Sequence, residues 1–169
     1  MKAKKWFDRQ FAFDFGPDSY PAIYQRLKQA PDNLSRALTG VPEEILVFQP
    51  DGGWSIKEHA GHLSVLEPIW QLRFADIRDS KPTLTPADLT NRATTEGNFN
   101  QQSVSALLET FAALRNATLT MLDQMDPTDE GRTSLHPRMK QPMRLIDHAY
   151  FIAEHDDHHI LRIGEILVI

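Results

Sequence analysis

The sequence contains no cysteine among its 169 residues. Disulfide bonds, cysteine-ligated zinc and a cysteine nucleophile are therefore excluded. Any metal ion must be held by histidine and carboxylate side chains, and any reacting thiol must come from another molecule. The missing cysteine narrows the chemistry of the protein without naming it.

Long hydrophobic runs and an excess of positive charge are also missing. No run approaches the roughly 18–20 apolar residues of a membrane span, so we expect no membrane insertion. The basic start of the chain is followed by Trp6-Phe7-Asp8-Arg9 and not by an apolar stretch, which predicts a cytoplasmic protein without a signal peptide. The net charge of −5 argues against nucleic-acid binding, because phosphate neutralisation needs clustered lysine and arginine.

The length and composition are those of one globular unit. A chain of 169 residues predicts a single domain over residues 1–169. Hydrophobic residues make up 41% of the sequence and charged residues 24%, which is ordinary for a globular protein.

Apolar residues recur every three or four positions in four segments, which predicts four amphipathic helices. The first begins in the Pro17–Pro21 segment and ends at Gly40, and the others run from Ser55 to Ser80, from about Gln102 to Met125 and from about Met143 to Leu167. Ser55 and Glu58 form the sequence pattern of a capping box at the start of the second helix. Pro31 predicts a kink or break in the first helix, and Pro68 a local bend in the second.

Two long polar connections separate the last three helices. Residues 81–100 predict a crossover with a short helical turn around Pro86–Leu89, and residues 127–142 form the second connection. Alternation with a period of two does not persist, so we expect an all-α fold, a four-helix bundle with long crossover connections. The aromatic segment from Trp6 to Phe15 requires burial, either across the bundle or against a second subunit.

Two histidines of the last helix form the first half of a candidate metal site. His155 and His159 are four residues apart on the apolar stripe, so their rings project from one face about one turn apart. An unpaired buried polar ring costs on the order of 1–3 kcal/mol, and a divalent ion would satisfy both rings. The alternative is a bundle without metal, in which the rings are hydrogen-bonded as single core histidines usually are.

The second helix supplies the third candidate ligand. His59 and His62 both border its core face, and helical geometry does not choose between them. The remaining histidines receive no ligand role: His136 lies in a connection, His148 is about 10 Å from His155 along the helix axis, and His158 is turned about 100° away from His159.

Two segments carry a resemblance to a known family. The stretches Gly53–Leu63 and Ala153–Ile163 resemble the DinB-like superfamily of four-helix metalloenzymes, and Asp88–Asn91, Leu135–Pro137 and Gln141–Met143 fit one branch of it. The resemblance extends over essentially the whole chain. It implies that the metal ligands are His62, His155 and His159, and that His59 is a neighbour of the site.

The resemblance also implies a range of activities. Three neutral histidines leave one coordination position open, as in catalytic zinc sites, and they suit Zn²⁺ or Ni²⁺ better than Mg²⁺ or Ca²⁺. Characterised relatives include transferases that use low-molecular-weight thiols and many homodimers. We therefore expect a metal-dependent thiol transferase or hydrolase with a small-molecule substrate that the sequence does not name. The alternative is a non-catalytic metal- or ligand-binding bundle, in which His59 or a carboxylate fills the fourth position.

Charged residues near the histidines complete the sequence-based expectations. Arg73 and Arg162 are candidates to face the cavity and bind an anionic substrate. Carboxylates often orient the rings of ligating histidines. Four are available, although each is equally well explained as a solvated helix charge: Glu58, Glu67, Asp156 and Asp157. No catalytic residue is assigned.

Overall fold

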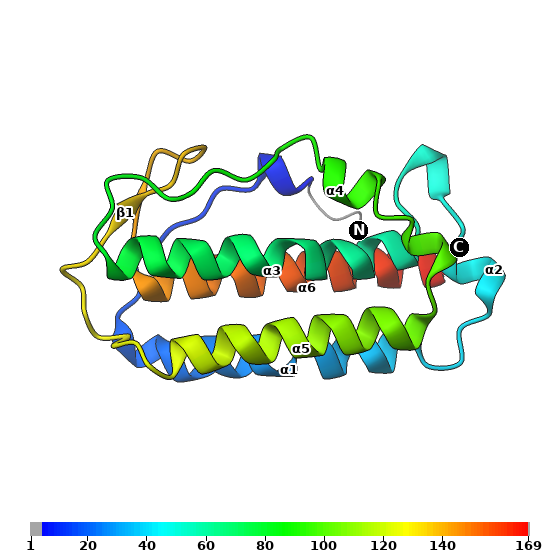
Figure 1. Cartoon of the computed structure of the whole chain (residues 1–169), viewed down its shortest axis with the longest axis horizontal. Helices are drawn as coiled ribbons and strands as arrows, with labels where there is room; N and C mark the ends of the chain where they lie inside the picture. Colours follow the sequence, from blue (N-terminus) through cyan, green and yellow to red (C-terminus); the bar gives the residue numbers. More distant parts are fainter. Residues whose placement is uncertain (1–4, 169) are drawn as a thin grey trace.

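The computed structural model describes residues 5–168 and is built around four long helices (Figure 1). They are α1 (Tyr20–Leu38), α3 (Ile56–Arg78), α5 (Val104–Leu122) and α6 (Leu145–Leu167). Helix α3 packs against α5 and α6, and α1 packs against the same two helices. The predicted all-α four-helix bundle is confirmed. Within residues 5–168 no helix is long and apolar enough to cross a membrane.

The direction of the helices sets the connections between them. The colours of Figure 1 show that α1 and α6 run one way and that α3 and α5 run the other way. Because α3 and α5 are parallel, residues 79–103 travel back along the bundle, and they carry α4 (Arg92–Thr95) and the 3₁₀ turn η4 (Phe99–Gln101). The connection from α5 to α6 stays at one end, so only the first of the two long connections is a crossover.

Local sequence explains where the helices begin and why one continues. The capping box is present: the Ser55 hydroxyl accepts from the Glu58 N–H at 3.1 Å, and the Glu58 carboxylate accepts from the Ser55 N–H at 2.7 Å. The predicted break at Pro31 is wrong, because α1 continues through it. Proline removes the donor to the carbonyl four residues earlier. That carbonyl belongs to Leu27 and accepts instead from Arg115 Nη1 at 3.0 Å.

The short helix expected at Pro86–Leu89 is absent, and α4 forms a few residues later. Residues 84–85 are held extended, because the Leu84 N–H donates to the Leu135 carbonyl and the Thr85 N–H donates to the Asp76 carboxylate. A small antiparallel sheet also forms in the second connection from β1 (Ser134–Leu135) and β2 (Pro142–Met143). Strands of two residues are too short to give a detectable alternation.

The segment before α1 packs on the bundle. It contains the 3₁₀ turns η1 (Trp6–Asp8) and η2 (Pro17–Ser19), and two more short elements, α2 (Glu43–Leu46) and η3 (Pro50–Gly52), lie between α1 and α3. The rings of Trp6 and Phe11 both contact Phe151 of α6, each at a centroid distance of 5.2 Å. The aromatic segment therefore packs on its own bundle, with Phe11 buried and Phe7 51% exposed.

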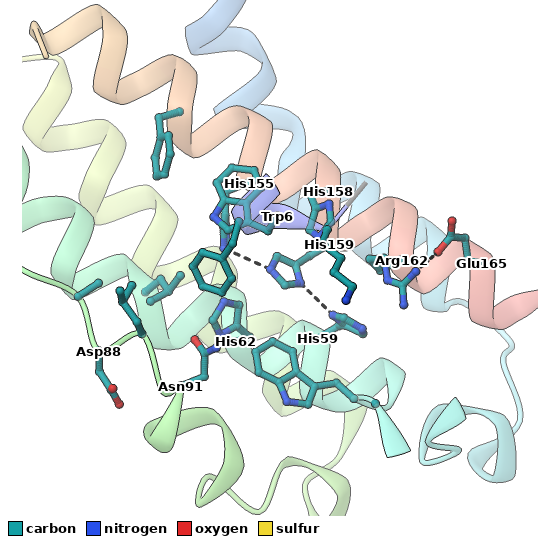
Figure 2. A pocket seen from close by; sticks show the side chains of 18 of the residues that line it. Trp6, His59, His62, Asp88, Asn91, His155, His158, His159, Arg162 and Glu165 are labelled. Carbon is teal, nitrogen blue, oxygen red and sulfur yellow. Dashed lines mark hydrogen bonds and ion pairs between the residues drawn. The ribbon is translucent and has the colours of Figure 1, made fainter. Parts of the chain in front are cut away.

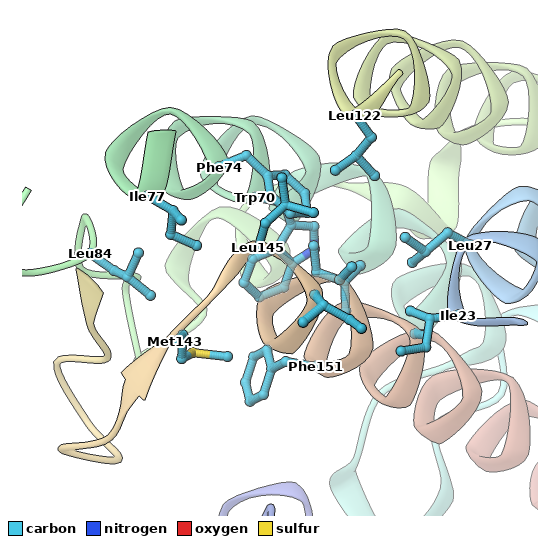
Figure 3. Close-up of a cluster of buried hydrophobic side chains, with 14 of the residues drawn as sticks. Ile23, Leu27, Trp70, Phe74, Ile77, Leu84, Leu122, Met143, Leu145 and Phe151 are labelled. Carbon is cyan, nitrogen blue, oxygen red and sulfur yellow. The ribbon is translucent and has the colours of Figure 1, made fainter. Parts of the chain in front are cut away.

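The core consists of two hydrophobic clusters separated by a polar layer. The first cluster, drawn in Figure 3, includes Ile23, Leu27, Trp70, Phe74, Ile77, Leu122, Leu145 and Phe151. The second includes Leu34, Leu38, Ile56, Leu63, Leu107, Phe111 and Ile163. Glu67, Arg115 and Asp156 lie between these positions on α3, α5 and α6 and are fully buried or nearly so. Both clusters therefore border a charged layer in the middle of the bundle.

Candidate metal centre

The structure brings together the three histidines that the family resemblance singled out. His62 of α3 points toward His155 and His159 of α6 (Figure 2). One ring nitrogen from each lies within 4.8 Å of the other two, and all three residues are buried. This grouping of neutral nitrogen donors fits a divalent metal ion.

Packing around α3 explains why His62 faces α6. The capping box fixes the first turn of α3, and Leu63 beside His62 is buried in the second hydrophobic cluster. Gly61 then allows the crossover to approach: a Cβ atom at this position would lie 2.4 Å from the ring of Phe99 in η4. The absence of a side chain at Gly61 thus lets the crossover lie directly over the His62 turn.

The spacing of the α6 histidines fits two ligands of one ion. The Nε2 atoms of His155 and His159 are 3.2 Å apart. Two nitrogens bound tetrahedrally to zinc at about 2.0–2.1 Å would be separated by about 3.3 Å. The observed separation therefore needs no large rearrangement to accept an ion.

The protonation state of the cluster also suits a metal. Burial is the main cause that lowers the pKa of His62 to about 3. Burial likewise holds the pKa values of His155 and His159 well below the ordinary 6.5. The rings are neutral at pH 7, and neutral imidazole is the form that binds metal ions.

Hydrogen bonds orient two of the three rings. His62 Nδ1 lies 2.8 Å from the Thr94 hydroxyl, and His159 Nδ1 lies 2.9 Å from His59 Nδ1. Ligating histidines commonly use their second nitrogen in this way. His155 Nδ1 has no hydrogen-bond partner within residues 5–168, and the Trp6 ring stands edge-on to this imidazole at 4.9 Å. His59 therefore lies beside the cluster.

Within residues 5–168, the four carboxylates that the sequence offers as ring-orienting groups do not contact the rings of His62, His155 or His159. Glu67 and Asp156 both bind Arg115, Asp157 binds Arg26, and Glu58 completes the cap of α3. Asp156 follows His155 directly, and one residue of helix turns the side chain by about 100°, away from the cluster. Thr94 and His59 hold the positions that carboxylates often hold in such sites.

The cluster opens into a cavity of about 940 Å³. Trp6, Trp54 and Trp70 line it, and the ring centroids of Trp54 and His62 are 4.6 Å apart. Its lining is more apolar than polar. The cavity is thus large enough for a small molecule to reach the histidines.

The two arginines considered from the sequence both line this cavity, with different partners. Arg162 forms an ion pair with Glu165 (Figure 2), whereas Arg73 is 2% exposed and has no carboxylate partner within residues 5–168. His158 is half-buried and also lines the cavity.

Sequence reasoning missed several residues around the site. His136 was given no role, but it is buried and lines the cavity together with Arg138. No sequence pattern marks Thr94. These residues lie in the connections, where no periodicity marks an inward face, and the family-like Leu135-His136-Pro137 stretch was the one available signal. His148 lies apart as expected, with Nε2 3.3 Å from the Trp70 carbonyl.

Comparison with known proteins agrees with the fold. The chain matches the structure of YfiT from Bacillus subtilis, described as a probable metal-dependent hydrolase with an unusual four-helix bundle topology. The match has a TM-score of 0.80 and 20% sequence identity, and it covers 94% of this chain and 91% of that chain. No curated protein matches the sequence. A family model for the DinB superfamily matches residues 26–163, and the chain therefore belongs to the DinB superfamily.

Proposed function

We propose that the protein is a metal-dependent enzyme in which His62, His155 and His159 bind one divalent ion, Zn²⁺ or Ni²⁺. Its reaction is the hydrolysis of a small molecule or the transfer of a low-molecular-weight thiol to one. The observation that carries the proposal is the convergence of three buried, neutral imidazoles on the floor of a 940 Å³ cavity. The description of YfiT as a probable metal-dependent hydrolase supports the hydrolase alternative.

The chain's own residues prepare this site for chemistry. A divalent ion held by three histidines supplies a Lewis acid, which lowers the pKa of a water or thiol at its open position. Thr94 and His59 fix the orientation of His62 and His159 through their second ring nitrogens. Trp6 and Trp54 pack against the imidazoles and exclude water from one side of the cluster.

A non-catalytic metal-binding protein is the competing function. It requires a protein group in the fourth coordination position, and His59 and the nearby carboxylates were the candidates. His59 Nδ1 instead faces His159 Nδ1, and the carboxylates have other partners. These contacts favour an open position, and therefore an enzyme.

Metal content tests the ligand assignment. Purified protein is stripped of metal, reloaded with Zn²⁺ or Ni²⁺ and analysed by mass spectrometry for metal per chain. We expect His155→Ala to lose the ion and His148→Gln to keep it, because His148 lies on the same helix but outside the cluster. Equal metal content in the two variants would contradict the assignment.

Activity tests the enzymatic part of the proposal. The loaded protein is assayed by stopped-flow for conjugation of several low-molecular-weight thiols to electrophiles, and against a panel of small esters and amides. We expect a rate above that of free metal and thiol, absent in His155→Ala. A protein that binds metal but accelerates none of these reactions is the non-catalytic alternative.

A further inference from the structure

The cavity has a second polar region, centred on the buried arginine of α3. Arg73 donates from Nε to the Thr85 carbonyl at 2.9 Å, and its guanidinium carbon lies 5.4 Å from the Trp70 ring centroid. Asp76 is the acidic residue one turn away, but its carboxylate binds Lys81 and Thr85. Arg73 is therefore a buried cation without an anionic partner within residues 5–168, an arrangement that is costly unless a ligand completes it.

His136 adds a mismatch of hydrogen-bond donors beside Arg73. Its Nδ1 receives the backbone N–H groups of Arg138 and Met139, each at 3.2 Å. Its Nε2 lies 3.3 Å from Arg73 Nη1. A guanidinium and a backbone amide can only donate, and a neutral imidazole has a single accepting nitrogen. If His136 Nδ1 accepts from the two backbone amides, Nε2 carries the proton. The Nε2–H group and the Arg73 guanidinium are then two donors that face each other with no acceptor between them.

Arg138 is the second cation in this region. Its Nη2 atom is buried and has no hydrogen-bond partner within the described chain. Its guanidinium lies over the Phe7 ring at 5.2 Å, and both residues line the cavity. Burial is the main cause that lowers the pKa of Arg73 to about 10; Asp76 opposes this shift and Arg138 adds to it, so Arg73 remains charged at pH 7.

We propose that Arg73, His136 and Arg138 form a binding subsite for an oxyanion, a carboxylate or phosphate group of the substrate. The subsite offers two cations and several donors, and within residues 5–168 neither arginine forms an ion pair with a carboxylate. An anionic oxygen would accept from Arg73, from His136 Nε2–H and from the free Arg138 Nη2 together. Guanidinium groups bind carboxylate and phosphate with the strongest hydrogen bonds available to side chains.

One indole ring separates this subsite from the histidine cluster. The Trp70 ring centroid is 5.4 Å from the Arg73 guanidinium carbon and 5.6 Å from the His155 ring centroid. A substrate with an anionic head and a short apolar body would therefore reach the cluster with its other end. This part rests on the proposed function, whereas binding of the anion does not.

Calorimetric titration of the metal-stripped 169-residue chain tests the subsite. Phenyl phosphate and phenylacetate are the two anionic probes, and benzyl alcohol is the neutral control of similar shape. Working without metal prevents the anion from binding directly to the ion. It also separates this test from the proposed function. Anion binding can be absent in a protein that binds metal, and it can be present in a protein that does not.

We expect saturable binding of at least one anion and much weaker binding of benzyl alcohol. The tighter anion identifies whether the head group is phosphate or carboxylate. Arg138→Gln should weaken anion binding roughly 10- to 100-fold, the loss typical of one hydrogen bond to a charged group. Arg73→Gln should weaken it at least as much, and Arg138 keeps the test decisive if that buried variant fails to fold.

Arg162→Gln is the matched control, because Arg162 lines the same cavity but is already paired with Glu165. Its anion affinity should equal that of the unmodified protein. The proposal is overturned if neither anion binds, if benzyl alcohol binds as tightly, if Arg138→Gln has no effect, or if Arg162→Gln loses as much affinity.

Discussion

Helices α3 and α6 each contribute to two buried polar clusters. The clusters differ in whether their side chains form pairs of opposite charge. In the middle of the bundle, Arg115 binds Glu67 and Asp156, with N–O distances of 2.5 and 2.6 Å. At the cavity, His62, His155 and His159 converge without a carboxylate, and His155 Nδ1 has no hydrogen-bond partner within residues 5–168.

The difference separates a structural role from a binding role. The Arg115 cluster joins α3, α5 and α6; Arg115 also donates to the Leu27 carbonyl of α1, and the Thr118 hydroxyl donates to Glu67. Each carboxylate in it is therefore paired with a cation inside the protein, although one oxygen of Asp156 has no hydrogen-bond partner within residues 5–168. The histidine cluster contains no pair of opposite charges, and one ring nitrogen of each histidine lies within 4.8 Å of the other two. This grouping fits a divalent metal ion supplied from outside the chain. Four predictions test this contrast, beginning with the largest expected effect.

Removing the cation of the ion cluster should have the largest effect. Arg115→Met leaves two carboxylates buried without a partner and should lower the free energy of unfolding by about 3–5 kcal/mol. Urea denaturation measures the change. A variant that also carries Glu67→Leu and Asp156→Leu should recover most of it, because no buried charge remains. A single variant as stable as the unmodified protein would contradict the structural role.

Binding of a metal ion to the histidine cluster should stabilise the folded protein. At a free Zn²⁺ concentration of about 100 times the dissociation constant, the free energy of unfolding should rise by about 2.7 kcal/mol. Thermal and urea unfolding with and without a chelator measure this change. His159→Ala should abolish the increase. A gain of equal size in His159→Ala would place the ion elsewhere.

The same substitution in the two clusters should give different results. Thr94→Val removes the hydroxyl beside His62 Nδ1 and should weaken metal binding about 10- to 100-fold. Thr118→Val removes the hydroxyl that binds Glu67 and should lower stability while leaving metal affinity unchanged. Competition titrations with a chromophoric chelator measure both affinities, and a similar loss in both variants would remove the distinction.

Acid should lower the free energy of unfolding, because the buried histidines are neutral in the folded protein and take up protons when it unfolds. Burial is the main reason that the pKa of His148 lies well below 6.5 in the folded state. Unfolding therefore takes up a proton below pH 6.5, so this stability is present above that pH and falls as the pH drops further. His148→Gln should reduce the pH slope of the unfolding free energy by about 1.4 kcal/mol per pH unit.

Urea denaturation of the metal-free protein at several pH values below 6.5 measures this slope. Arg36→Gln is the control, because Arg36 is exposed and bonded to Asn33. An unchanged slope in His148→Gln would mean that this histidine is already charged in the folded protein.

The helices could be predicted from the sequence because their signals are local. The capping box at Ser55 and the repeat of apolar residues place α3 and α6 within a few residues of their observed bounds. The four-residue spacing of His155 and His159 gave two members of the cluster. Helix geometry left His59 and His62 equal, because each borders the core and only the packing of α3 against α6 separates them.

The remaining contacts depend on residues distant in sequence. Arg115 looks like an ordinary polar position of α5, and its burial follows from acidic residues 48 and 41 positions away. Thr94, His136 and Arg138 lie in connections without periodicity. The crossover brings Thr94 to His62, and the loop of the small sheet brings His136 and Arg138 to the cavity. The misplaced short helix has the same origin, because contacts of residues 84–85 with α3 and β1 keep the chain extended.

The origin of the cavity walls has a consequence for how such a protein can diversify. The three converging histidines come from α3 and α6, whereas much of the facing wall comes from the N-terminal segment, the crossover and the loop that carries His136. Substitutions and insertions are tolerated in connections far better than in packed helices. A lineage with this architecture can therefore change the shape and charge of its cavity by remodelling loops, while the scaffold and its histidines are inherited intact.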